Sequence, residues 1–305
     1  MVFSLATMRV NGENTAAIKV GGRFWPLAAA SHTAGTGDLP RDLMAVFQDW
    51  KSCWPRLEAL AAACASEKMD QALAVDGPGV SLCAPLLFPH KVICAGANYY
   101  DHVREMGTKD IDKSKLQPFF FLKPPTTTIV GPGPTVRMPN GDSKFDWELE
   151  LALVIGETCK DIAEGDAISV IAGYTVAVDF TARALQFAAP TRFRIDWFSS
   201  KCQDTTCPIG PVIVPARFAG DPANLRLRLE VNGDTMQDSS TSDMIFTAAE
   251  LVAQASRVTT LEPGDLILTG TPAGVGMPKG KFLKRGDRVA ASIESIGTLN
   301  LEIAA

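Results

Sequence analysis

Histidine is scarce in this chain, and several widespread catalytic motifs are missing from it. The 305 residues include only three histidines, at positions 32, 90 and 102. The sequence contains no phosphate-binding-loop motif, no GxGxxG, no GxSxG and no HExxH. These absences argue against a nucleotide-binding protein, a serine hydrolase of the common type and a zinc protease.

The cysteines do not form a recognisable framework either. Seven are present, which is an odd number, and no two of them show the paired spacing of a zinc site. Scattered cysteines of this kind indicate reduced thiols rather than a set of disulfides.

Excess basic charge and long apolar runs are also lacking. The net charge is −5 and the pI is about 5.3, so we expect no nucleic acid or membrane as partner, because both attract basic faces. The apolar stretches 119–122 and 151–155 are far shorter than the roughly 20 residues that cross a bilayer. The N-terminus lacks the basic start, apolar block and cleavage site of a signal peptide. We therefore expect a cytoplasmic protein.

The N-terminal part is predicted to be a small α+β domain spanning residues 1–85. Residues 3–26 alternate β-prone runs with turn signals, and residues 40–67 carry apolar side chains at helical spacing. A break follows at residues 76–79, and proline-containing residues 83–85 precede a second β-rich region. No chemistry is evident in this part, which is expected to serve packing or to support a dimer.

Residues 86–305 are predicted to form the catalytic domain, in which strands dominate. Residues 225–231 alternate strictly and end at Asn232-Gly233, which is a hairpin signal. A second hairpin is predicted for 287–293 and 298–303, and a helix with a capping box for 247–257. Because the strands do not alternate regularly with helices, we expect mixed β structure with some α, curled into a β-roll or barrel.

Residues 144–156 combine three acidic side chains with an apolar run. Asp146, Glu148 and Glu150 recur with period two, so in a strand their side chains share one face. The pattern alone is typical of an edge strand with a solvated acidic face. The apolar run 151–155 that follows instead indicates a buried strand, where carboxylates need a partner such as a cation.

Asp179 could complete a set of three carboxylates. It ends the β-prone run 173–178, so it is expected at the end of a strand. Carboxylates brought together repel one another unless a divalent ion neutralises them. An all-oxygen set of this kind suits Mg²⁺ or Mn²⁺.

A second candidate group lies at His102 and Glu105, which are three residues apart. On a helix they would be neighbours, so the carboxylate could support the imidazole as a general base. A solvated pair on a surface helix has the same spacing. His32 and His90 are expected to have ordinary surface or turn positions.

Two further features could bind substrate. Lys201 lies in a neutral and apolar context and could hold an oxyanion, although a solvated lysine fits equally. The small-residue loop 270–276 contains Thr271 and could receive a carboxylate through backbone N–H groups, although a plain turn would use the same residues.

Six blocks, taken in order, closely resemble the fumarylacetoacetate hydrolase superfamily, particularly its acylpyruvase-like and 2-hydroxyhepta-2,4-diene-1,7-dioate isomerase-like members. They are GANYYDHVREMG, PFFFLKP, DWELELALVIG, GYTVAVDFTAR, LTGTPAGVG and IESIGTL. The match covers roughly residues 91 to 303 and implies a β-roll with Mg²⁺ or Mn²⁺ bound by Glu148, Glu150 and Asp179. It also implies a dyad of His102 and Glu105 that activates water. Lys201, Gln186 and Thr271 match substrate-contacting positions of the family. Arg183 and Tyr100 are further residues that we expect to contact the substrate.

Two positions depart from the family pattern. Ala97 stands where short acylpyruvase-like members carry an arginine, so the substrate carboxylate is not recognised by that route. Residues 108–117 form a longer and more charged stretch than in compact members, which predicts a larger lid.

The resemblance predicts a hydrolase that cleaves a carbon–carbon bond in a 2,4-diketo acid, such as an acylpyruvate or an aromatic ring-cleavage product. The alternatives are decarboxylation or keto–enol isomerisation of a related oxo-acid at the same metal site, or a non-catalytic binding protein. The pair His102 and Glu105 favours hydrolysis, because that reaction requires a water-activating base. The partner is expected to be a small-molecule oxo-acid, and the resemblance implies a homodimer.

Overall fold

The N-terminal part begins with a three-stranded antiparallel meander. The computed structural model describes residues 1–66, 69–75, 80–108, 110–141, 144–188 and 194–304. Strands β1 (Ser4–Val10), β2 (Glu13–Val20) and β3 (Arg23–Pro26) pair in order. The predicted turns are confirmed, with Asn11 and both glycines of the Gly21-Gly22 pair at positive φ. Such angles are adopted readily by glycine and asparagine.

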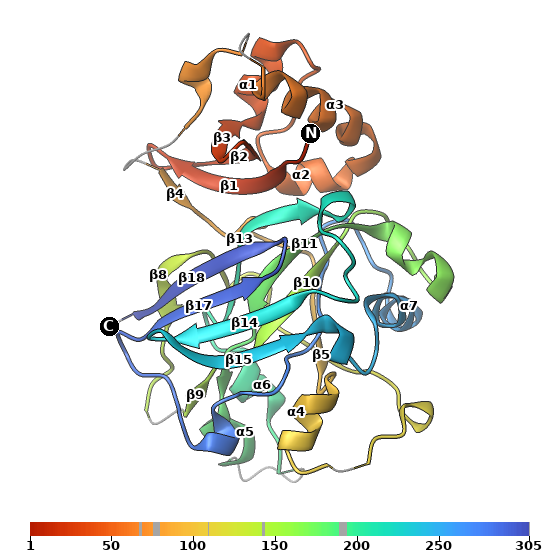
Figure 1. Cartoon of the computed structure of the whole chain (residues 1–305), viewed down its shortest axis with the longest axis vertical. Coiled ribbons are helices and arrows are strands. Elements are labelled where there is room, and N and C mark those ends of the chain that lie inside the picture. The colour runs from red at the N-terminus through yellow and green to blue at the C-terminus, as the bar shows by residue number, and fades with distance from the viewer. Residues whose placement is uncertain (67–68, 76–79, 109, 142–143, 189–193, 305) are drawn as a thin grey trace.

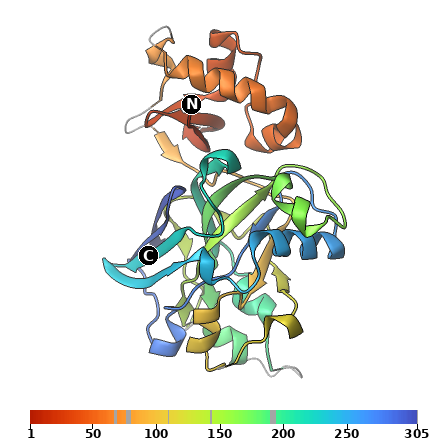
Figure 2. The same ribbon diagram turned by 45° about the vertical axis from the view of Figure 1, so that its right-hand side comes forward.

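Three helices cover this meander, and Figures 1 and 2 show them gathered at one end of the molecule. They are α1 (Leu27–Ala34), α2 (Leu43–Gln48) and α3 (Trp50–Cys64). The helical prediction for residues 40–67 is largely confirmed within the described part of that range, although Asp49 separates two helices. Asp42 caps α2 by accepting from two backbone N–H groups. The predicted break at residues 76–79 lies outside the described residues.

The N-terminal meander continues into a long sheet that also carries the central strands. The order is β3-β2-β1-β13-β11-β10-β16-β5-β6, with β4 (Val80–Leu82) beside β1 and β7 (Ile129–Val130) beside β13. Along this order only β16 and β5 are parallel neighbours. The bounds are β5 (Val92–Gly96), β6 (Phe119–Leu122), β10 (Leu149–Ile155), β11 (Ile171–Val178), β13 (Cys207–Pro215) and β16 (Leu266–Leu268).

A five-stranded sheet packs against the long one and contains both predicted hairpins. Its order is β15-β14-β17-β18-β8. The bounds are β8 (Gly133–Arg137), β14 (Arg226–Val231), β15 (Asp234–Ser240), β17 (Arg288–Ile293) and β18 (Gly297–Ala304). The capping box of α7 (Ala248–Val258) is confirmed. A two-stranded sheet joins β9 (Phe145–Asp146) to β12 (Thr181–Ala182).

The sheets are open in the described part of the chain. The long sheet ends at β3 and β6, and the five-stranded sheet ends at β15 and β8. The mixed fold and its roll are thus confirmed, whereas the alternative of a closed barrel is wrong. Each sheet is a linear row of hydrogen-bonded strands, and within the described residues its two outermost strands are not paired with each other, as they would be in a closed barrel.

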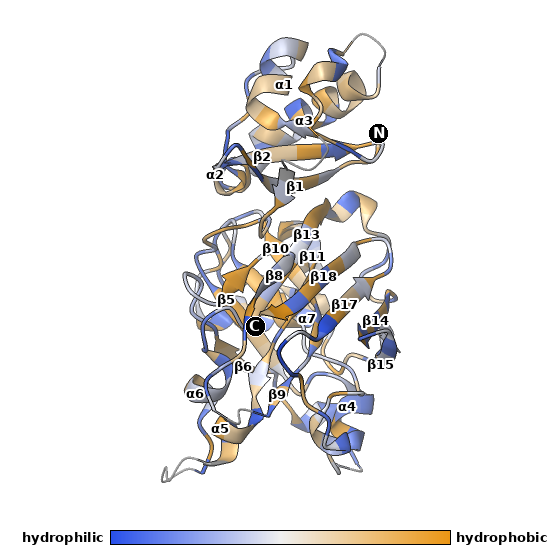
Figure 3. Cartoon of the chain, turned by 90° about the vertical axis from the view of Figure 1, so that its left-hand side faces the viewer, coloured by the Kyte–Doolittle hydropathy of each residue, from blue (hydrophilic) through white to orange (hydrophobic). Residues whose placement is uncertain are grey.

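Two hydrophobic clusters hold these layers together. The inner core lies between the two sheets and includes Leu149, Leu151 and Leu153. The N-terminal core lies between α1–α3 and the long sheet, and includes Ala152 and Val154. Strand β10 therefore presents alternate side chains to two cores, and Figure 3 shows its strongly hydrophobic colouring.

Two predictions from composition can be compared with this fold. All seven cysteines have free thiols, as predicted. No helix within the described ranges is long and apolar enough to cross a membrane.

Candidate active site with an acidic triad

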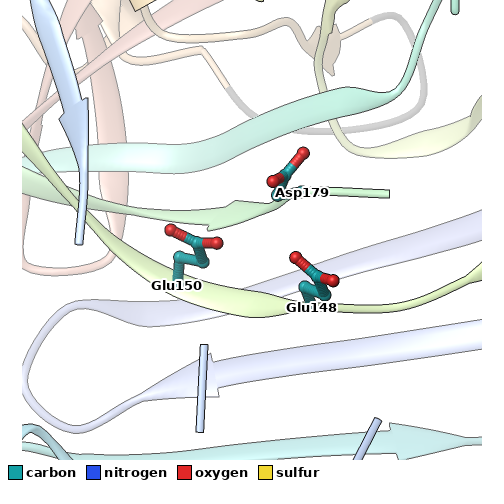
Figure 4. A group of neighbouring side chains, drawn as sticks. All are labelled: Glu148, Glu150 and Asp179. Atoms are coloured by element: carbon teal, nitrogen blue, oxygen red, sulfur yellow. The ribbon is translucent and has the colours of Figure 1, made fainter. Parts of the chain in front are cut away.

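Glu148, Glu150 and Asp179 come together as predicted. Each offers a carboxylate oxygen within 4.8 Å of the others, and Figure 4 shows the three groups converging from neighbouring segments. Leu149 pairs with Val178 across β10 and β11, and the Asp179 N–H donates to the Glu148 carbonyl at 2.8 Å. The strand register thus brings the carboxylates together. All three side chains are buried, so the solvated acidic face is wrong for them.

Three buried cations contact these carboxylates. Lys201 Nζ lies 2.6 Å from both Glu148 Oε2 and Asp179 Oδ2. Lys123 Nζ lies 2.6 Å from the other Asp179 oxygen, and Arg183 donates to Glu148. Although burial alone would raise it, the charges of Lys201 and Arg183 lower the pKa of Glu148 to about 2. Lys201 is therefore an ion-paired component of the site, and the alternative of a solvated lysine is wrong.

The donor set fits a hard divalent cation. Burial, and then the charges of Asp179 and Glu148, raise the pKa of Glu150 well above its usual range. Because burial and the repulsion of neighbouring carboxylates both disfavour the charged form of Glu150, a divalent ion bound between the carboxylates would favour it. Buried carboxylate oxygens are ligands that suit Mg²⁺ and Mn²⁺.

Metal affinity is expected to rise with pH. Because burial and the charges of Asp179 and Glu148 raise the pKa of Glu150, binding of Mg²⁺ to its carboxylate is expected to be coupled to loss of its proton. Below that pKa the affinity should increase by about tenfold per pH unit. Calorimetric titration at a series of pH values, in buffers of different ionisation enthalpy, measures both the affinity and the protons released. A pH-independent affinity without proton release would contradict this expectation.

Asp146 has a different role from the two glutamates. Its side chain is fully buried, and it accepts from Arg183 Nε at 2.9 Å and from the backbone N–H groups of Gly276 and Met277 at 2.6 and 3.1 Å. Of the two positions left open for Asp146, the surface one is wrong. Asp146 instead orients Arg183, whose other end contacts Glu148.

His102 and Glu105 form the predicted pair on α4 (Tyr100–Glu105). His102 Nδ1 lies 3.0 Å from Glu105 Oε1, and the Gly274 N–H donates to both oxygens of Glu105 at 3.0 Å. Only 8% of His102 is exposed, so a solvated pair is wrong. His32 and His90 are exposed, as expected.

A cavity of about 190 Å³ is lined by His102 of the dyad and by all three carboxylates of the triad. Its wall comes from β5, α4, β10, the end of β11, α5 (Arg183–Ala188), α6 (Trp197–Lys201) and the loop after β16. The predicted residues on this wall are His102, Glu148, Glu150, Asp179, Arg183, Gln186, Lys201 and Thr271. Tyr100 is not among the described lining residues. Its ring lies under Arg104 instead, so its contact with substrate stays a prediction.

A larger hollow of about 920 Å³ adjoins this cavity and shares Gly96, Ala97 and Val103 with it. Its wall includes much of the stretch 108–117 that was predicted to be a lid, of which residue 109 lies outside the described residues. Lys113 in this stretch is paired with Glu250 of α7 at 2.7 Å. Ala97, where the family's short members carry an arginine, lines both spaces.

Sequence reasoning missed three residues at the site, of which Lys123 and Gln237 are buried and Asp101 is partly buried. Lys123 belongs to a block that was matched without assigning it a role, and Gln237 Nε2 donates to Thr271 Oγ1 at 2.8 Å. Asp101 accepts the Ala273 N–H at 3.0 Å. The position of Lys123 directly after an apolar run was an available signal, whereas the contacts of Gln237 and Asp101 depend on distant parts of the chain.

Comparison with known families and relatives agrees with this geometry. The family model described as "Fumarylacetoacetate (FAA) hydrolase C-terminal" matches residues 91–304. An oxaloacetate tautomerase, mitochondrial, from Xenopus laevis is 43% identical over 223 residues, which are 72% of this chain and 67% of the relative.

Solved structures are similar over the whole chain or over its larger part. A fumarylacetoacetate hydrolase from psychrophilic Exiguobacterium antarcticum has a TM-score of 0.79 at 32% identity, covering 99% of both chains. A fumarylpyruvate hydrolase from Pseudomonas aeruginosa, in complex with Mn²⁺ and pyruvate, has a TM-score of 0.64 at 33% identity, covering 73% of this chain and 91% of that one.

Proposed function

Since the chain belongs to the fumarylacetoacetate hydrolase family, we propose that it is a metal-dependent enzyme that interconverts the keto and enol forms of a small 2-oxo acid such as oxaloacetate. The observation that carries the proposal is the shared cavity, in which His102, paired with Glu105, lies beside a buried acidic triad. A base beside a cation-binding site is the arrangement that proton transfer next to a carbonyl requires. The similarity to an oxaloacetate tautomerase supports this reaction.

The charge of the site favours an anionic substrate. Four buried carboxylates and three buried cations, namely Asp146, Glu148, Glu150, Asp179, Lys123, Arg183 and Lys201, leave one formal negative charge in the cluster. A bound divalent ion would leave one positive charge instead. A carboxylate of a 2-oxo acid would neutralise it without any basic residue at Ala97.

The residues of the chain would move the proton. His102, held by Glu105 at its Nδ1, would remove a proton from the carbon next to the 2-oxo group through its other ring nitrogen. When bound by Glu148, Glu150 and Asp179, Mg²⁺ or Mn²⁺ supplies Lewis-acid polarisation of the substrate oxygens.

The second half of the reaction stabilises the resulting negative charge and returns the proton. Lys201 donates to two carboxylates and keeps a third N–H, which would stabilise the negative charge that develops on the 2-oxo oxygen. Return of the proton to that oxygen gives the enol, so atoms and charge balance.

Hydrolysis of an acylpyruvate is the second candidate. The similarity to a fumarylpyruvate hydrolase that binds Mn²⁺ and pyruvate supports it. In this reaction His102 would deprotonate water, which attacks the distal carbonyl. The dyad does not favour hydrolysis over isomerisation, contrary to the expectation from the sequence, because one base serves both reactions.

One set of assays separates the candidates. The Mg²⁺-loaded protein is mixed with enol oxaloacetate, and the loss of enol absorbance is followed beside pyruvate formation. The same is done with acylpyruvates, including fumarylpyruvate. Enol loss faster than in buffer and without pyruvate supports the proposal. Pyruvate from oxaloacetate would indicate decarboxylation, and pyruvate from an acylpyruvate would indicate hydrolysis. Binding of these acids without any turnover would support a binding protein instead.

Two further predictions accompany the proposed function. We keep the homodimer implied by the family resemblance, which light scattering can test. We also keep the cytoplasmic location as a prediction, although the name of the Xenopus laevis relative places that protein in mitochondria.

A further inference from the structure

The loop from Gly270 to Met277 contacts both halves of the site through its backbone. Five of its N–H groups donate to four different acidic side chains, because Gly276 and Met277 share Asp146. Gly270 contacts Glu150 at 2.6 Å, Ala273 contacts Asp101 at 3.0 Å, Gly274 contacts Glu105 at 3.0 Å, and Gly276 contacts Asp146 at 2.6 Å. The first and last of these acids belong to the triad side of the site, and the middle two belong to α4.

Helix α4 is held to this loop at two points one turn apart. Asp101 and Glu105 are four residues apart, so they lie on one face of the helix. They accept from the consecutive amides of Ala273 and Gly274. His102 lies between these two contacts, so the loop fixes the base as well as the carboxylate that supports it.

Asp101 has further contacts that hold it in place. Its second oxygen accepts from Ser239 Oγ at 2.8 Å, and its backbone N–H donates to Asp243 at 2.7 Å. Both partners lie in or directly after β15, on the neighbouring sheet. Asp101 therefore joins α4, the loop and β15 at one point.

The loop itself has little freedom to shift. Gly274 has a φ of +104°, and a Cβ added there would collide with the Met236 carbonyl oxygen. Gln237 also donates to the Pro272 carbonyl at 2.8 Å. A loop packed this tightly can serve as a rigid reference for both groups.

We propose that Asp101 is a positioning residue for the base, and that it sets His102 against the acidic triad through the Gly270–Met277 loop. This proposal depends on the proposed function only in the choice of the reaction that His102 catalyses. Asp101 reaches the substrate through His102 and does not line the cavity.

The test compares Asp101→Ala, which removes the acceptor, with Asp101→Asn, which keeps an oxygen for the Ala273 N–H. We expect kcat to fall about 100-fold in Asp101→Ala, the loss typical of a displacement of about 1 Å at a catalytic group. The KM and the Mg²⁺ affinity from calorimetry should stay near the wild-type values, because Glu150 and its contact are intact. Asp101→Asn should restore most of the turnover.

Imidazole NMR signals give a readout that does not depend on turnover. With only three histidines in the chain, each can be assigned by substitution. In Asp101→Ala the His102 signals should broaden or double, while those of His32 and His90 stay unchanged. Asp38→Ala is the matched control, because Asp38 contacts exposed His32 at 3.2 Å. It should move the His32 signals alone and leave turnover intact.

The outcomes separate the inference from the proposed function. If the wild-type protein turns over none of the substrates, the proposed function fails, and the His102 signals still test the position of the base. Unchanged His102 signals in Asp101→Ala would overturn the inference. Equal losses in Asp101→Ala and Asp101→Asn, together with lower Mg²⁺ affinity, would also overturn it, since they would indicate general damage. Should Asp101→Ala fail to fold, Ser239→Ala removes one contact of Asp101 and should disturb the His102 signals in the same way.

Discussion

A His102→Ala variant is expected to lose about 100- to 10,000-fold in kcat, the range that a positioned general base contributes. His102 lines the cavity that also contains the triad, and it is the only histidine on that wall within the described residues. Its removal leaves the three carboxylates and their cations in place. The Mg²⁺ affinity, measured by calorimetry, should therefore be close to that of the wild-type protein.

The control for this variant is His90→Ala, because His90 is exposed and outside the cavity. It should keep full activity. Undiminished turnover in His102→Ala would remove His102 from the mechanism, whichever of the two reactions the enzyme catalyses. A loss of Mg²⁺ affinity equal to the loss in kcat would instead assign His102 to the metal site.

A Glu150→Gln variant is expected to bind Mg²⁺ at least about 100-fold more weakly, since loss of a ligand should exceed the 10- to 100-fold effect typical of outer-shell partners. The amide keeps an oxygen for the Gly270 N–H, which donates to Glu150 at 2.6 Å. The backbone contact is thus preserved while the negative charge is lost. Calorimetric titration measures the affinity, and turnover should recover partly at high Mg²⁺ concentration.

Glu164→Gln is the matched control, because Glu164 is exposed on a short helical turn and does not line the cavity. It should bind Mg²⁺ like the wild-type protein. If Glu150→Gln bound Mg²⁺ with unchanged affinity, Glu150 would have to be removed from the ligand set. The same result would weaken the interpretation of its raised pKa as a demand for a cation.

Local periodicity predicted the elements whose contacts are close in sequence. The spacing of His102 and Glu105 predicted their 3.0 Å contact, because residues three apart on a helix are neighbours. Period two predicted that Glu148 and Glu150 share a face. It failed for Asp146, because β9 ends at Asp146 and β10 begins at Leu149, so the backbone between them does not continue as one strand.

Long-range pairing could not be predicted in the same way. Lys123 and Asp179 are 56 residues apart, and no local pattern indicates that these two side chains form an ion pair. The amide contacts of the Gly270–Met277 loop likewise depend on how three distant segments meet. The six-block resemblance supplied the ligand set, whereas the cations that balance it became visible only in the fold.

The shared position of β10 between two cores links ion binding to the stability of the N-terminal part. Leu151 and Leu153 belong to the inner core, and Ala152 and Val154 to the N-terminal core. An ion held by Glu150 stabilises the folded form of this strand, and a ligand that binds only the folded form shifts the unfolding equilibrium by mass action. Glu150 lies on the same face of β10 as Ala152 and Val154, so ion binding is expected to be coupled to the packing of α1–α3 on this face. Trp25, buried in the N-terminal core, would then report by fluorescence on an ion bound further along the same face of β10.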